Sequence, residues 1–357
     1  MGDVADNQEP LSPADELHKA AERLRRHAEY SQQIIDEAER RQVTDKRKGY
    51  FVGISGCILA SESADSGIAV PASDDQPIFV ITPVTNIPDL GSLSRALTPG
   101  IRPHYAHLSH LSRMINHELF ISERIASTPQ AALNVAYRAI SLTRLKSNCL
   151  INAISFSRVP WGQVAAHTND LVIQPLEEPR RALWESQSVI TEDDLTWVVS
   201  QLARDFDLYE QPSYRLAYDS AADAPFLKDS RTAVARIWSG IESLFDVQNE
   251  LSFRLSMYAA VLISDNFEQR TDIQARFKRL YTMRSKAVHG VKMDAAKLEE
   301  TLVSSWSLLR DLLLACMRTG AAIPSTNALD RALLGHPLTR DDGGLPRATD
   351  QATDAES

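Results

Sequence analysis

The sequence predicts an α+β protein, with a mixed α/β domain of unknown role at residues 46–190 and an all-α four-helix bundle within residues 191–322. Runs rich in β-branched and aromatic residues, bounded by Gly, Pro, Ser and Asp, occur only in the first of these regions. Apolar residues spaced three and four apart dominate from Thr191 onward, which is typical of amphipathic helices. The length of 357 residues also favours two domains over one.

The two ends of the chain lack the pattern of a packed domain. Residues 1–45 are predicted to be a disordered start and one long helix at about residues 12–41, and residues 323–357 a largely disordered tail. The polar, acidic N-terminus resembles neither a signal nor a transit peptide, and no apolar run is long enough to span a membrane. The three distant cysteines favour a reducing, cytoplasmic location over a disulfide framework or a cysteine zinc site.

Three strands and one helix are predicted in the mixed domain. The strands correspond to β-rich runs at residues 50–60, 77–84 and 149–159. The helix begins at Thr128-Pro129, since proline is favoured in the first turn. The pattern leaves the order of the strands in the sheet open.

The C-terminal region is predicted to be helical throughout. Thr191 is a suitable N-cap, followed by acidic residues in the first turn. Four further amphipathic or apolar segments with short joins then predict a four-helix bundle, at residues from about 229, from 250, 265–289 and 295–318. The third begins at Asp265 and stops at Gly290, which suits the position after a helix.

The third segment contains an arginine where an apolar residue is expected. Arg284 falls in the middle of the predicted buried stripe, which comprises Ile273, Phe277, Leu280, Tyr281 and Val288. A buried guanidinium must be paired or face a polar groove or subunit interface. Glu242, at the border of the first segment's stripe, is its candidate partner. His289 lies in the last turn and is predicted to face solvent in a monomer.

Charge is distributed unevenly. The net charge of −9 argues against a protein that coats nucleic acid. Residues 270–292, however, contain seven basic residues against one acidic residue, Asp272. This predicts a local phosphate-binding surface, with a solvated helix face as the alternative.

These residues resemble a known family. RSKAVHG at residues 284–290 has the R-x4-H form of HEPN domains, and GIESLF, ELSFRLSMYAAVL and RLYTMRSKAVHG occur in the expected order. Residues 208–320 therefore resemble the Apea-like HEPN branch, found in bacterial defence and toxin-type proteins.

The resemblance implies a metal-independent endoribonuclease without a cofactor, acting on RNA as a homodimer. His289 would act as general base or acid, and Arg284 would hold the scissile phosphate. Ser285 stands where many members have Asn, Asp or His, and Tyr281 and Lys286 are candidate substrate contacts. The resemblance also implies an antitoxin or another defence-system protein as a partner, and no association with a membrane is expected.

Other interpretations stay open at this stage. Arg284 and His289 would also suit a structural ion-pair network in a bundle, with Glu242 as a carboxylate that neutralises Arg284. The domain could also be a non-catalytic scaffold or an RNA- or nucleotide-binding component. A cluster of four histidines and a glutamate would point together and could hold a divalent metal if it formed one helix: His104, His107, His110, His117 and Glu118. Its spacing matches no metal motif, so a surface or partly buried polar helix without a metal is the preferred interpretation. The sequence has no phosphate-binding glycine motif and no G-x-S-x-G elbow.

Overall fold

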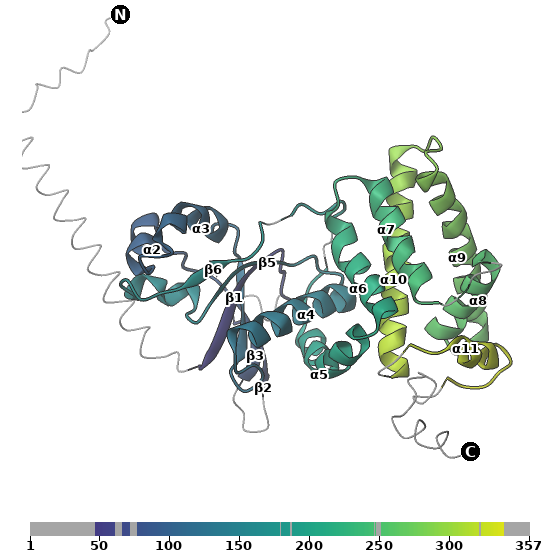
Figure 1. Ribbon diagram of the computed structural model, residues 1–357, viewed down its shortest axis with the longest axis horizontal. Helices are drawn as coiled ribbons and strands as arrows, with labels where there is room; N and C mark the ends of the chain where they lie inside the picture. The colour runs from purple at the N-terminus through teal and green to yellow at the C-terminus, as the bar shows by residue number, and fades with distance from the viewer. Residues whose placement is uncertain are drawn as a thin grey trace, which may run out of the picture.

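The computed structural model describes residues 47–60, 66–71, 77–178, 180–185, 188–245, 247, 251–320 and 323–338. The helix predicted at residues 12–41 and the tail from residue 339 lie outside the described residues. Within them the chain is an α+β protein, with an antiparallel sheet in the N-terminal part and helices in the C-terminal part (Figure 1).

Six strands form one antiparallel sheet in the order β2-β3-β4-β1-β5-β6. The strands are β1 (Gly49–Ser55), β2 (Ile68–Pro71), β3 (Pro77–Pro83), β4 (His117–Ser122), β5 (Asn152–Ser157) and β6 (Ile173–Pro175). The predictions of strands at β1, β3 and β5 are confirmed. The other three strands were not predicted, and one of them, β4, lies in the interior of the sheet between β3 and β1.

Helices pack on this sheet in two groups. A cluster of buried residues joins β5 and β6 to α2 (Leu90–Ala96), α3 (Tyr105–Ser112) and the 3-10 helix η3 (Trp161–Ala166). The long helix α4 (Pro129–Ser147) contacts β1, β4 and β5. Its predicted start is confirmed, because the Thr128 side chain accepts the Ala131 N–H at 3.2 Å.

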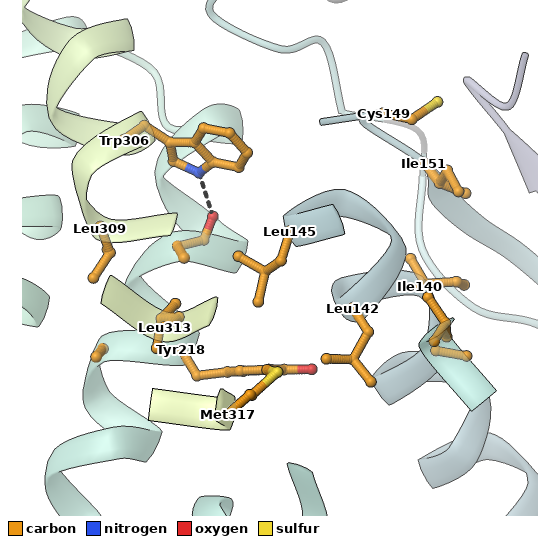
Figure 2. Packing of buried hydrophobic residues seen from close by; sticks show 14 of the residues in the cluster. Ile140, Leu142, Leu145, Cys149, Ile151, Tyr218, Trp306, Leu309, Leu313 and Met317 are labelled. Atoms are coloured by element: carbon orange, nitrogen blue, oxygen red, sulfur yellow. Dashed lines mark hydrogen bonds between the residues drawn. The ribbon is translucent and has the colours of Figure 1, made fainter. Parts of the chain in front are cut away.

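The helix α4 also connects the sheet to the C-terminal helices (Figure 1). Leu142 and Leu145 of α4 face Leu313 and Met317 of α10 (Ala295–Thr319), so one core cluster continues across the junction (Figure 2). The side chain of Arg310 on α10 donates from Nε to the Leu145 carbonyl at 2.6 Å. The helix α5 (Glu192–Tyr209), predicted as part of the helical region, contacts β2 and α4 as well.

The remaining helices are α6 (Pro212–Asp223), α7 (Ser230–Ser243), α8 (Leu251–Ile263), α9 (Phe267–Val288) and α11 (Thr326–Leu333), with short 3-10 helices η2 (Arg102–His104) and η4 (Ala224–Phe226) elsewhere. The helices predicted over α7, α8, α9 and α10 are confirmed as helices that pack on one another. The predicted stripe of α7 is buried throughout: Val234, Ile237, Trp238, Ile241, Leu244 and Phe245.

Two predicted boundaries in this region are wrong. The helix α9 begins after Asn266 rather than at Asp265, because the Asn266 side chain accepts the Gln269 N–H at 3.1 Å while Asp265 is exposed. The tail predicted from residue 323 contains the helix α11, which is capped by Ser325 and packs on α8. Its buried residue Leu329 joins the main core, which explains why so short a helix is ordered there.

A buried ionic cluster lies where α4 meets α5 and α6. Asp205 is fully buried, 3.5 Å from Arg138 Nη1, and accepts a hydrogen bond from the Tyr214 hydroxyl at 3.3 Å. Arg138 stacks on the Tyr209 ring with 3.2 Å between Cζ and the ring centroid. Burial raises the pKa of Asp205 to about 6, although Arg138 and the tyrosines act in the opposite direction.

This raised pKa predicts a specific pH dependence of stability. Because the folded protein holds the Asp205 proton more tightly than the unfolded chain does, its contribution to stability is complete below pH 3.8 and is lost as the pH rises through about 6. At about 1.4 kcal/mol per pKa unit the loss is at most about 3 kcal/mol.

The measurement is urea denaturation of wild type and Asp205→Asn from pH 4.5 to 7.5. Relative to the variant, which cannot ionise, the wild type is expected to lose free energy of unfolding over this interval. The quantity to compare is the change in the free energy of unfolding with pH. The absolute stabilities of the two proteins differ for another reason, because the amide also leaves Arg138 without an anionic partner. Parallel pH profiles for the two proteins would contradict the prediction.

Candidate functional site

The C-terminal end of α9 is a well-formed helix stop. Gly290 has φ +72°, in the left-handed region that glycine adopts readily. The Val291 N–H bonds to the Lys286 carbonyl at 3.0 Å and the Gly290 N–H to the Ala287 carbonyl at 3.4 Å, which is the Schellman arrangement. The prediction that the helix stops at this glycine is confirmed, and the stop places His289 at the helix cap.

Arg284 and Glu242 form a partly buried ion pair between α9 and α7, as the sequence predicted. Arg284 Nη2 lies 3.3 Å from one carboxylate oxygen of Glu242 and 3.5 Å from the other. The side chains of Arg284 and Glu242 are 25% and 29% exposed. These distances are longer than the roughly 2.7–2.9 Å of a tight charge-assisted hydrogen bond, so the pair is loose.

The guanidinium of Arg284 keeps donors that this pair does not use. Its Nε is buried and has no hydrogen-bond partner among the described residues. A buried donor without an acceptor is costly, so this Nε could still donate to a further acceptor. Arg284 Cζ also lies 5.7 Å from the centroid of the Tyr281 ring, within range of a cation–π contact.

The other predicted site residues surround this end of α9. His289 is exposed, as expected for a monomer, and its backbone N–H bonds to the Ser285 carbonyl at 3.0 Å. Ser285 is half-buried and Lys286 is exposed. Tyr281 is half-buried, because its ring packs edge-on against Trp238.

The predicted buried stripe of α9 needs one correction. Phe277 and Leu280 are buried and Ile273 and Tyr281 are half-buried, but Val288 is 41% exposed, and the buried residue of the last turn is Ala287. The turn that ends the helix therefore lies at the surface, with Val288 and His289 both accessible.

The basic surface predicted for residues 270–292 is smaller than the charge count indicates. Three of its seven cations are in ion pairs with carboxylates at 3.0–3.8 Å: Arg270 with Asp265, Arg276 with Asp311 and Arg284 with Glu242. The other four are exposed: Lys278, Arg279, Lys286 and Lys292. These four, spread along the exposed side of α9 and the turn after it, are the cations best placed to meet a phosphate backbone.

The histidine cluster does not lie on a single helix, so the interpretation of residues 104–118 as one helix is wrong. His107 and His110 are exposed on α3, whereas His117 and Glu118 belong to the interior strand β4. Glu118 is buried and accepts the Trp161 N–H at 2.8 Å. Within the part of the chain that the structure describes, no three His, Cys, Asp or Glu side chains are grouped so as to hold a metal ion.

One residue near the motif was not predicted. Arg231, in the first turn of α7, donates from Nη1 to the Ala287 carbonyl at 2.7 Å and from Nη2 to the Val291 carbonyl at 2.9 Å. Both acceptors are backbone atoms of the turn around His289. Sequence patterns describe side chains, and they contain no signal for a contact of this kind.

Comparisons of the chain with protein families, characterised proteins and solved structures found no match. Among the described residues, no helix combines the length and the apolar character needed to cross a membrane.

Proposed function

We propose that residues 208–320 form a HEPN domain and that the chain is a metal-independent endoribonuclease acting through Arg284 and His289. The observation that supports this most directly is the arrangement at the end of α9. There a loosely paired arginine with a spare donor and an exposed histidine belong to one R-x4-H motif. These supply a cation for a phosphate and an imidazole for proton transfer.

In the proposed reaction, His289 takes the proton of the ribose 2′-hydroxyl and delivers a proton to the leaving 5′-oxygen. The 2′-oxygen attacks the adjacent phosphorus, the bond to the 5′-oxygen breaks, and the products are a 2′,3′-cyclic phosphate and a 5′-hydroxyl. Arg284 holds the scissile phosphate and stabilises the charge that develops on its oxygens. The loose pair with Glu242 orients the guanidinium and is compatible with its sharing a second anion.

A homodimer is part of the proposal. Two motifs facing each other across a dimer axis would give the exposed His289 a partner surface and would bring two sets of cations together. On the family resemblance we propose a role in bacterial anti-phage or toxin-type defence, with an antitoxin or defence-system partner. The three distant cysteines support a cytoplasmic location for it.

A second candidate is a non-catalytic HEPN module that serves as a scaffold or binds RNA or a nucleotide. The engagement of Arg284 by Glu242 favours it, because that pair can be purely structural. Ser285, a weaker polar group than the family's usual Asn, Asp or His, favours it as well.

The deciding experiment is incubation of the full chain with total RNA and with a short labelled RNA in the presence of EDTA. The wild type is expected to cleave and to leave 2′,3′-cyclic phosphate ends, whereas a double Arg284→Ala, His289→Ala variant leaves the RNA intact. Expression of the wild type, but not of the double variant, is expected to arrest bacterial growth. Intact RNA in both samples, together with equal growth, would reject the enzyme and favour the non-catalytic module.

A further inference from the structure

Arg231 is placed where elementary electrostatics does not favour it. It lies in the first turn of α7, the positive end of the helix dipole, where a cation is disfavoured. Its guanidinium instead reaches the C-terminal end of α9, the negative end of another dipole, and bonds to two backbone carbonyls there. The contact with α9 therefore accounts for a cation at this position.

The two carbonyls lie on either side of His289. One belongs to Ala287, two residues before the histidine, and the other to Val291, two residues after it. The backbone of Arg231 is held in turn, because its N–H donates to the Asp229 carboxylate at 3.0 Å. A planar guanidinium bonded at two points restrains the turn in both position and direction, which a single hydrogen bond does not achieve.

We infer that Arg231 is a positioning residue, which holds the turn carrying His289 in the orientation needed for cleavage. The side chain of His289 is exposed, so packing does little to fix it, and the direction of its Cα–Cβ bond depends on the backbone of residues 287–291. This inference rests on the proposed function, since a misplaced histidine matters only if it transfers a proton. A shift of about 1 Å in such a group can cost about a hundredfold in rate.

The kinetic test compares Arg231→Ala and Arg231→Lys with the wild type on a short labelled RNA. The alanine variant is expected to lose about tenfold to a hundredfold in kcat with KM changed less than about threefold, because it affects the reacting geometry rather than RNA binding. Lysine, which provides a charge but no planar fork, should restore only part of the rate. A wild-type kcat in a folded alanine variant, or an effect confined to KM, would overturn the inference.

Arg236→Ala is the matched control. Arg236 lies on the same helix and pairs with Asp223 at 3.8 Å, away from the turn. This variant is expected to keep the wild-type kcat, so a general effect of removing an arginine from α7 would be recognised.

Hydrogen exchange separates this inference from the proposed function. The amides of Gly290 and Val291 are expected to exchange about tenfold faster in Arg231→Ala than in the wild type or Arg236→Ala. This readout needs no activity. If the wild type does not cleave RNA but these amides lose protection, the proposed function fails and the restraint by Arg231 stands. Unchanged exchange would show that Arg231 does not hold the turn.

Discussion

Replacing Arg284 with alanine is expected to slow RNA cleavage by about 10²–10³-fold, because the transition state loses a preorganised donor to the scissile phosphate. Part of this loss should appear in kcat, since the charge on the phosphate oxygens is greatest in the transition state. The measurement is kcat and KM on a short labelled RNA. Arg284→Lys should recover little, because lysine is a point charge and lacks the guanidinium fork.

Two control variants make this result specific. Glu242→Gln keeps the shape of the partner and removes its charge, so it should retain cleavage within about tenfold and bind RNA at least as well. Arg276→Ala removes a cation of the same helix that pairs with Asp311, 3.0 Å away, and should change cleavage far less than Arg284→Ala. If Arg284→Ala cleaved as fast as the wild type, Arg284 would be the structural partner of Glu242 and nothing more.

The helices and the ion pair were predictable because they depend on local periodicity. Apolar residues at three- and four-residue spacing define the face of α7 that is buried, and the same rule places Arg284 on the inner side of α9. Once both faces are known, an arginine in one stripe and a glutamate at the edge of the other are natural partners. The Arg284–Glu242 contact was predicted from the sequence in this way, and the structure confirms it.

The strand β4, the order of the sheet and the contacts of Arg231 could not be predicted, because they depend on residues distant in sequence. The strand β4 begins with His117 and Glu118, whose spacing from earlier histidines suggested a helix, and only pairing with β1 and β3 makes the segment a strand. The order β2-β3-β4-β1-β5-β6 is likewise a matter of hydrogen bonding between strands, several of them far apart in the sequence, and not of the residue pattern of any one strand. Arg231 acts on backbone carbonyls 56 and 60 residues away.

Replacing Trp238 with alanine is expected to destabilise the protein by about 3–5 kcal/mol, the largest stability effect that we predict. Trp238 is fully buried on α7, with its ring edge-on to Phe277 and Tyr281 of α9 at centroid distances of 5.2 and 5.4 Å. Its Nε1 donates to the buried Ser305 hydroxyl of α10 at 3.1 Å. Alanine would leave a cavity where three helices meet and a buried hydroxyl without its partner. The measurement is urea denaturation, in which the midpoint is expected to fall while the m-value stays unchanged.

Trp197→Ala provides the comparison, because this half-buried tryptophan of α5 contacts Lys146 at the surface. Trp197→Ala should lower the free energy of unfolding by about 1 kcal/mol, which is typical of a single substitution. Trp238→Phe should fall between the two, since it keeps an aromatic ring against Phe277 and loses the bond to Ser305. Equal losses in the free energy of unfolding for Trp238→Ala and Trp197→Ala would contradict the placement of Trp238 in the core. Because Trp238 packs under Tyr281, beside the motif, a folded Trp238→Phe that cleaves slowly would show that this core also supports the site.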